Sequence, residues 1–276
     1  MRLVRSLTVL ALLVSPTLVH AQASHEERDA DWLQDCLDDG RHSNDDRGRA
    51  CEVRAVPVKL SGRSISIDGQ RNGSIRVIGW DGDSVRVSAR IQAQAPTDAI
   101  AKAMLPRIHV ITDGRGVRSE GPDMEREDDT GWSVSYVAYV PRRFDLDLDA
   151  HNGSLGVHGV SGKLDLRTVN GSLAVSDIGG DVRANTRNGS LNVRLSGKAW
   201  DGAGLDAETR NGSVRLSVPE SYSASLEVGT VNGPIRTDIP VTVSGRISRE
   251  LNVPLGGGGK PIRVHTTNGP VTISRN

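Results

Sequence analysis

The sequence is poor in aromatic side chains, and its positive and negative charges cancel. Only 3% of the 276 residues are Phe, Trp or Tyr, and they do not recur at a fixed interval along the chain. Sugar-binding faces of repeat proteins usually carry aromatic platforms at the repeat period, so this scarcity argues against a processive carbohydrate surface. The formal net charge is zero, whereas a nucleic-acid-binding protein is expected to show a basic patch or stripe. Nucleic acid is therefore not an expected partner.

Long apolar runs are also scarce. The first of them, Ser6–Val14, follows Arg2 and Arg5 and precedes small residues at Ala21 and Ala23, which is the pattern of a secretory signal peptide. It is too short to remain as an anchor, and no later stretch approaches the roughly 18 apolar residues of a membrane-spanning helix. We expect cleavage after Ala21 (or Ala23) and an exported mature chain, periplasmic or extracellular, without a transmembrane anchor.

Cysteine is nearly absent, since Cys36 and Cys51 are the only two. An even count in an exported protein suggests a disulfide. The polar segment 24–52 around them has too few apolar residues to form its own core, so the bridge would restrain a weakly structured N-terminal cap. A metal site that adds His25 or His42 to the thiols is the alternative, but Cys-x-x-Cys and paired-His spacings are missing. We expect no metal and no cofactor.

The sequence does contain a recurring Asn-Gly dipeptide. Its asparagines are Asn72, Asn152, Asn170, Asn188, Asn211, Asn232 and Asn268. The last six are separated by 18, 18, 23, 21 and 36 residues, which indicates one supersecondary unit stacked on its neighbours to bury an apolar face. We interpret the longest interval as two coils, one of which, roughly residues 237–254, has lost its Asn-Gly.

Apolar and polar residues alternate on both sides of each Asn-Gly. Three residues after the asparagines stand Leu155, Leu173, Leu191, Val214, Ile235 and Val271. A period of two predicts strands with one buried face. Asn and Gly tolerate positive φ, so the dipeptide marks the turn between two strands.

Two arrangements of these strands compete. Asn-Gly between alternating strands is a strong hairpin signal and would suggest an antiparallel meander. In a parallel solenoid, equivalent positions instead lie about 4.8 Å apart, which explains why like residues follow one another and lets asparagines form amide ladders. We therefore predict an all-β fold, a parallel β-solenoid of roughly 18-residue coils, with Asn152, Asn170, Asn188, Asn211, Asn232 and Asn268 in one turn column.

The regular pattern does not extend over the whole chain. We expect a signal peptide (1–23), the polar cap segment (24–52), an irregular first half of the β domain (53–145) and the regular repeats (146–276). One short helix is expected over residues 97–105, because Thr97 or Asp98 can cap it and Pro106 ends it.

The segment Tyr136–Val157, with Val-Pro at a strand end, alternating apolar residues and then Asn-Gly-Ser, resembles a bacterial β-strand repeat family of unknown function. Its members are described as candidate adhesins and are related to auto-transporter adhesin head domains. The resemblance covers roughly residues 53–276. It implies a β-repeat fold and an adhesin-like role, and it brings no established catalytic residues.

Two kinds of chemistry could be built from these residues. Ser154 with His151 or His158 could form a hydrolytic site, but a nucleophile needs a base within hydrogen-bond reach and a third orienting group, and the serine recurs in other repeats without histidine. Asp147 and its outward neighbours could serve an acidic-polysaccharide enzyme, although an arginine, Arg183, interrupts the acidic strip. Five Asn-Gly-Ser sequons are interpreted as turns.

We predict a non-enzymatic exported β-solenoid, an adhesin-like envelope or surface interaction module of unknown ligand and oligomeric state. The alternative is a polysaccharide-active β-helix enzyme, a lyase or hydrolase. Three or more carboxylates that converge in an exposed groove would favour the enzyme.

Overall fold

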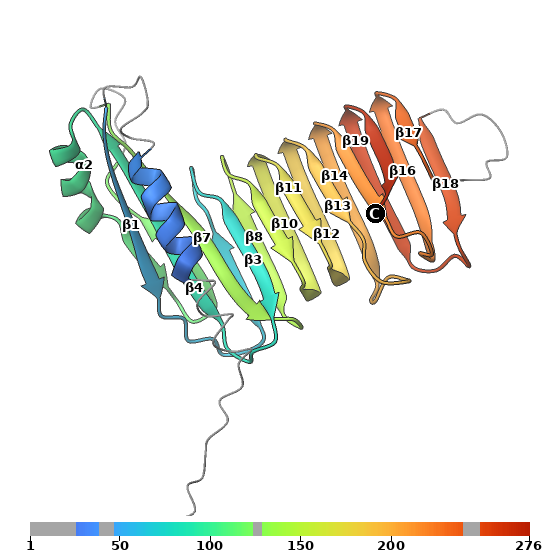
Figure 1. Cartoon of the computed structure of the whole chain (residues 1–276), viewed down its shortest axis with the longest axis horizontal. Coiled ribbons are helices and arrows are strands. Elements are labelled where there is room, and N and C mark those ends of the chain that lie inside the picture. Colours follow the sequence, from blue (N-terminus) through green and yellow to red (C-terminus); the bar gives the residue numbers. More distant parts are fainter. Residues whose placement is uncertain (1–25, 39–46, 124–128, 240–248) are drawn as a thin grey trace, which may run out of the picture.

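A computed structural model describes residues 26–38, 47–123, 129–239 and 249–276. The chain is mostly β-structure, with two ten-stranded sheets in which most neighbouring strands are parallel. Figure 1 shows the strands as a row along the long axis of the molecule. The expected signal peptide (1–23), with both candidate cleavage points, lies outside the described residues. None of the described helices has the length and apolar character needed to cross a bilayer.

Each sheet takes its strands from along the whole described chain. The first sheet contains, in spatial order, β1 (Gly48–Val56), β4 (Arg86–Ala95), β7 (Gly131–Pro141), β3 (Ile75–Trp80), β9 (Leu155–His158), β11 (Leu173–Ser176), β13 (Leu191–Arg194), β15 (Val214–Val218), β20 (Val271–Arg275) and β17 (Ile235–Thr237). The second sheet contains β18 (Glu250–Leu255), β16 (Ala224–Asn232), β19 (Pro261–Asn268), β14 (Gly204–Asn211), β12 (Gly179–Asn188), β10 (Ser161–Asn170), β8 (Asp145–Ala150), β2 (Ser64–Asp68), β6 (Gly116–Glu120) and β5 (His109–Thr112).

The two strands that flank an Asn-Gly lie in different sheets, and each pairs in parallel with its equivalent in the next repeat. Leu164 of β10 is opposite Val182 of β12, and Leu173 of β11 is opposite Leu191 of β13. These inward side chains are at most 1% exposed. The antiparallel meander is therefore wrong, because the strands on either side of each turn do not pair with each other.

The glycines of the turns are required by close stacking. A Cβ atom added to Gly153 would lie 2.0 Å from the carbonyl oxygen of Gly73, and one on Gly171 would lie 2.1 Å from that of Gly153. Among the described Asn-Gly glycines, only Gly269 has a φ in the left-handed region. The expected reason, positive φ, is wrong for the other turns. Glycine is needed because successive turns approach too closely for any side chain.

The C-terminal repeat is inserted out of sequence order. Strands β19 and β20 lie between the repeat of β14 and β15 and the repeat of β16 and β17, so Asn268 is opposite both Asn211 and Asn232. The predicted degenerate coil at residues 237–254 is wrong. Of that stretch, β18 runs antiparallel to β16 at the edge of the second sheet, and residues 240–248 lie outside the described residues.

The stack also begins earlier than the boundary expected between residues 145 and 146. Ile65 of β2 is opposite Leu146, and Ile75 of β3 is opposite Leu155, in the register of the later repeats. The residues between this first repeat and β8 form an insertion, and the described residues that precede the first repeat pack with it; we call the two together the N-terminal insertion. In it, β1, β4 and β7 are antiparallel neighbours, and β6 is antiparallel to β5.

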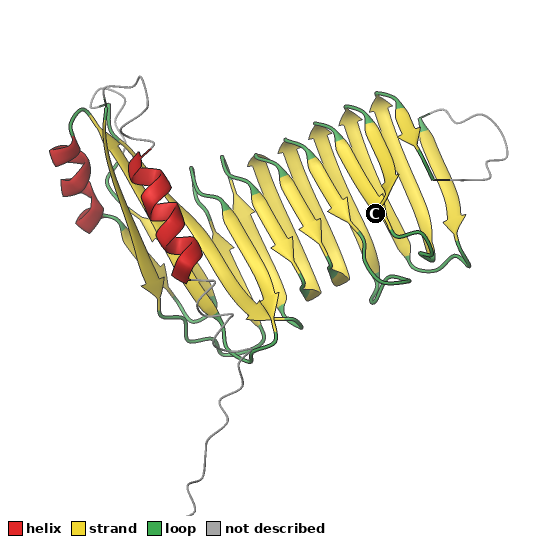
Figure 2. Ribbon diagram, viewed as in Figure 1, coloured by secondary structure: helices red, strands yellow, loops and turns green. Residues whose placement is uncertain are grey.

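Among the described residues, two α-helices accompany the sheets, whereas one was expected; Figure 2 shows them in red. The predicted one is α2 (Asp98–Met104), where the Thr97 side chain accepts a hydrogen bond from the Ile100 amide and the turn η1 (Leu105–Arg107) follows. The unpredicted helix spans residues 26–38. Its buried positions recur at helical spacing, but the first of them is Asp29. A charged residue in the buried stripe hid the periodicity.

Candidate functional site

The turn asparagines are hydrogen-bonded to one another in a line along the stack. In every pair, the side-chain Nδ2 of one residue donates to the Oδ1 of its neighbour. The pairs are Asn152 to Asn72 at 3.1 Å, Asn170 to Asn152 at 2.8 Å, Asn188 to Asn170 at 2.7 Å, Asn211 to Asn188 at 2.8 Å, Asn268 to Asn211 at 2.7 Å and Asn232 to Asn268 at 2.8 Å. We call this line the asparagine ladder. Because the side-chain amides hydrogen-bond to one another, the ladder stabilises the turns and does not present a separate reactive group.

Beneath the ladder, the hydroxyl groups of a column of buried threonines also make a hydrogen bond that is repeated from one turn to the next. Thr168 donates from Oγ1 to the carbonyl oxygen of Gly153 at 2.8 Å, and Thr186 donates to Gly171 at 2.8 Å. The later repeats keep the pattern. Each hydroxyl thus finds an acceptor in the adjacent turn, as a buried polar group must to avoid a desolvation cost.

The two cysteines are joined to each other. A disulfide links Cys36 of the helix over residues 26–38 to Cys51 of β1, which leaves no thiol for the alternative metal site. His25 and His42 lie outside the described residues. Within the described part of the chain, no group of three or more His, Cys, Asp or Glu side chains is placed to hold a metal ion.

A serine, a histidine and an aspartate do meet on the outer face of the first sheet, but not as a catalytic triad. The Nδ1 atom of His158 lies 2.9 Å from Ser176 Oγ and 3.3 Å from Asp177 Oδ2. A triad places the serine and the carboxylate on opposite ring nitrogens, whereas here both lie at Nδ1. Ser154 meets another serine instead, since its backbone amide donates to Ser74 Oγ at 3.1 Å.

Three aspartates converge on one arginine on the outer face of the second sheet. Arg167 lies 2.6 Å from Asp147, 3.2 Å from Asp149 and 2.6 Å from Asp165. Burial lowers the pKa of Arg167, but the Asp149 hydrogen bond and the charges of Asp165 and Asp147 more than offset this, so the net shift is upward. These carboxylates are ion-paired on an open face. They therefore do not form the acid/base pair that a polysaccharide-cleaving enzyme needs.

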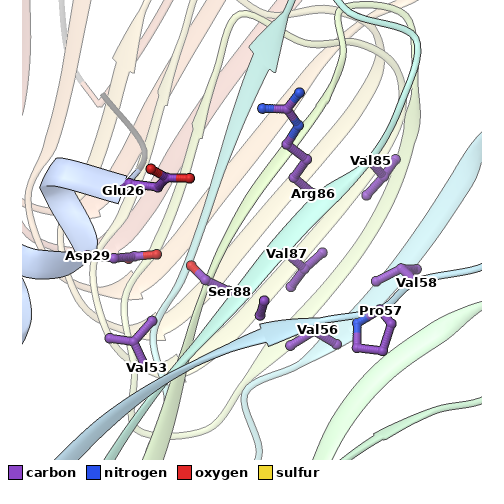
Figure 3. A pocket seen from close by; sticks show the side chains of 11 residues that line it. Glu26, Asp29, Val53, Val56, Pro57, Val58, Val85, Arg86, Val87 and Ser88 are labelled. Carbon is purple, nitrogen blue, oxygen red and sulfur yellow. The ribbon is translucent and has the colours of Figure 1, made fainter. Parts of the chain in front are cut away.

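A hollow of about 600 Å³ lies at the N-terminal end, between the start of the helix over residues 26–38 and strands β1 and β4. We call it the N-terminal cleft. Figure 3 shows Glu26 and Asp29 on the helix, with Ser88 and Arg86 on the side of β4 that faces the helix and Val87 on the other side of that strand. Sequence reasoning missed this cleft because its helix was not predicted. The alternation of Val85, Arg86, Val87 and Ser88 is the signal in the sequence, because it indicates a strand with one apolar face and one polar face.

The polar groups of the N-terminal cleft differ in how well they are satisfied. Asp29 is 9% exposed and accepts a hydrogen bond from Arg90 Nε at 2.8 Å. Ser88 is 2% exposed, and its hydroxyl has no hydrogen-bond partner among the described residues. The Arg86 guanidinium lies 4.4 Å from the centroid of the Trp80 ring. It makes no ion pair with a described carboxylate.

Comparison with known proteins identifies the regular repeats. Residues 142–274 match the family model described as Toastrack DUF4097, which confirms the resemblance inferred from the sequence for that part of the chain. No curated protein matches the chain.

The solved structures that are similar to this chain differ widely from it in sequence. A candidate cell adhesion protein from Clostridium sporogenes is 9% identical, with 83% of this chain and 100% of that chain covered and a TM-score of 0.41. A candidate adhesin from Bacteroides fragilis is 12% identical, with 82% and 97% covered and a TM-score of 0.31. A candidate lipid-binding protein from Parabacteroides distasonis is 11% identical, with 82% and 96% covered and a TM-score of 0.31. At these values the likeness extends to no particular site.

Proposed function

Because its regular repeats match the Toastrack DUF4097 family, we propose that the chain is a non-enzymatic exported β-solenoid, an adhesin-like interaction module of the envelope or cell surface. One observation carries this proposal: the repeated polar side chains satisfy one another. The asparagine ladder, the buried threonines and the Arg167 cluster each engage their own neighbours. A scaffold of this kind presents a long, rigid surface without a chemically distinct centre.

The solenoid assignment rests on the path of the chain from sheet to sheet. Each regular repeat contributes one strand to each of the two sheets, and an Asn-Gly turn joins the two strands. The next repeat pairs with it in parallel register. This path describes one coil of roughly 18 residues. It supports a β-solenoid in which the insertion between β3 and β8 and the out-of-order C-terminal repeat are local departures.

Export is proposed from the disulfide together with the N-terminal pattern. Disulfides persist in oxidising compartments, and the Cys36–Cys51 bridge fits a protein outside the cytoplasm. We propose cleavage after Ala21 (or Ala23), which would leave a mature chain that begins shortly before the helix over residues 26–38. N-terminal sequencing of the protein from periplasm and culture medium would locate the cleavage point and separate the two destinations.

The proposed role is tested by measuring binding and turnover with the same preparation. We expect the labelled mature protein to bind isolated envelopes saturably and to be displaced by unlabelled protein. Leu173→Asp, which places a charge in the core, supplies an unfolded control. Lack of saturable envelope binding would contradict the proposed role.

The alternative enzyme is tested on acidic polysaccharides, with and without calcium, because three aspartates do converge at Arg167. We expect no turnover, since those carboxylates are ion-paired. Activity that disappears in Asp147→Asn or His151→Ala, but not in the matched outward-facing variant Asp206→Asn, would establish the enzyme instead.

A further inference from the structure

We propose that the edge of the stack formed by the asparagine ladder binds a linear acidic polysaccharide, which lies along the ladder across successive repeats. We call this surface the ladder edge. It comprises the turn asparagines, the residue before each of them and the serine or proline two residues after. Figure 2 shows the turns of the stack as a row of loops along one edge. This site rests on the proposed adhesin-like role, because it gives that interaction module its class of ligand.

The residue before each turn asparagine carries the charge of the ladder edge. It is arginine in three of the seven Asn-Gly repeats, histidine in one and acidic in none; the four basic residues are Arg71, His151, Arg187 and Arg210. They follow strands β2, β8, β12 and β14, and β10 is the only other strand between these in the sheet. Neighbouring parallel strands lie about 4.8 Å apart, so the row extends over four intervals, or about 19 Å. The basic residues therefore form a narrow line along the stack.

Two arginines of this row are neighbours without a counter-charge. Strands β12 and β14 pair in register on both sides of this position, so Arg187 lies beside Arg210. Both are exposed, and neither makes an ion pair with a carboxylate of the described residues, Glu208 included. At the other end of β3 and β7, by contrast, Arg142 lies 2.6 Å from Asp81. Because like charges on adjacent strands repel each other, a bound anion would stabilise the arginine pair.

The rest of the ladder edge supplies neutral hydrogen-bond donors. A side-chain amide has two N–H donors, and each ladder bond uses one of them, as from Asn188 to Asn170. The other N–H remains for a ligand. The serines two residues after the asparagines, such as Ser172 and Ser190, add half-buried hydroxyl groups. Donors that recur at strand spacing match a polymer with recurring acceptors, namely carboxylates and sugar hydroxyls.

The side chains of the ladder edge favour a polysaccharide over other polyanions. Proteins that bind single-stranded nucleic acids stack aromatic side chains on the bases, and the row before the asparagines contains no Phe, Trp or Tyr. Helices that bind a bilayer surface insert large apolar side chains, whereas the apolar residues of this row are Val169 and Val231. Aromatic platforms usually hold neutral sugars, but an acidic polymer is attracted through its charges.

Binding of oligogalacturonates of defined length to the mature protein tests the ladder edge. Fluorescence anisotropy of the labelled oligomer should show saturable binding, and the methyl ester, which has the same chain without the charges, should bind at least about tenfold more weakly. Affinity should rise with length until the oligomer spans the basic row. Dextran sulfate, compared with dextran, gives the same test for sulfate groups. Lack of saturable binding by both acidic polymers, or an affinity independent of length, would overturn the proposal.

Two double variants in the same two repeats locate the bound polymer. Arg187→Gln combined with Arg210→Gln should weaken binding by about tenfold or more, because two charge-assisted contacts are lost. Arg194→Gln combined with Arg215→Gln removes the same charge from exposed positions of β13 and β15 and should not weaken it. Thermal unfolding of each variant confirms that it folds. An equal loss in both variants would mean that net charge alone attracts the polymer, which would overturn the ladder edge as the site.

Envelope binding by the same variants separates this site from the proposed role. Saturable envelope binding that is unchanged in the Arg187 and Arg210 double variant would overturn the ladder edge as the adhesive surface, and the adhesin-like role would stand. Saturable binding of an acidic oligomer without saturable envelope binding would contradict the adhesin-like role and would support the ladder edge as a polysaccharide site.

Discussion

The regular stack and the N-terminal insertion are built by opposite means. In the stack, each residue is supported by its equivalent in the next repeat, as in the asparagine ladder and the facing pair Leu173 and Leu191. In the insertion, each contact occurs once. Arg54, for example, donates to the carbonyl oxygens of Ile108 at 2.5 Å and Leu105 at 2.8 Å, and a single disulfide fastens the helix over residues 26–38.

This difference bears on where function is found. A repeated contact stabilises the stack, but it engages the repeated asparagines with one another and the repeated threonines with carbonyl oxygens of the adjacent turns. Unique contacts leave some groups without a polar partner in the described part of the chain, such as the buried Ser88 hydroxyl and Arg86, which lies over the Trp80 ring. The residues first considered for catalysis, Ser154, His151 and Asp147, all lie in the repeats, whereas the N-terminal cleft lies in the insertion.

The largest effect is expected from truncating a core side chain within the stack. Leu173 is fully buried, with Leu155 on one side and Leu191 on the other. Leu173→Ala should lower the free energy of unfolding by about 2–5 kcal/mol, the usual cost of a buried leucine truncation. Urea denaturation measures it. Arg183→Ala, at an exposed position of β12, should change it by less than about 0.5 kcal/mol. The reverse ranking would mean that the assigned faces are inverted.

In the insertion, the disulfide should act locally. Replacing Cys36 and Cys51 by serine removes a cross-link whose loop-closure entropy is worth about 3 kcal/mol at most. Because the bridge joins only the helix over residues 26–38 to β1, the loss should loosen that helix and leave the repeats folded. Hydrogen exchange should rise in residues 26–38 and remain slow in β10–β14. Loss of protection throughout the stack would show that the two regions unfold together.

The repeats could be predicted well from the sequence, because parallel stacking places equivalent positions of successive repeats in contact and so favours similar residues there. A buried column of leucine and valine, and a turn glycine with no room for a Cβ, can be seen in one sequence as a period. The same similarity between repeats means that their spatial order cannot be inferred from the sequence. Ile262, Val264 and Thr266 match the inner positions of both β14 and β16, so nothing in their pattern indicates that β19 lies between those strands.

The insertion was harder to predict, because its contacts are not periodic. Asp29 occupies a buried helical position and is stabilised there by Arg90, a residue 61 positions away. The N-terminal cleft depends on this helix and on antiparallel pairing of β1 with β4. Neither can be inferred from local alternation, which identifies strands and their faces but not their partners.

A smaller, pH-dependent effect should arise in the insertion from Tyr136 of β7. Burial raises the pKa of its phenol to about 12, above the usual value near 10. The folded state holds this proton more tightly, so the stabilisation is complete below about pH 10 and is lost as the pH rises toward 12. The loss is at most about 3 kcal/mol. Denaturation at increasing pH should show a shallower decline for Tyr136→Phe. Identical slopes would mean that Tyr136 is not responsible.

The smallest effect should come from the asparagine ladder. Asn188 donates to Asn170 and accepts from Asn211, so Asn188→Ala removes two side-chain hydrogen bonds. Asn72 is at the end of the ladder, where it accepts one hydrogen bond, from Asn152. Because water reaches these exposed amides, each bond should contribute about 0.5–1 kcal/mol. Urea denaturation should therefore show about twice the loss for Asn188→Ala as for Asn72→Ala. Equal losses would mean that each asparagine stabilises only its own turn, and that the hydrogen bonds between asparagines do not contribute to the free energy of unfolding.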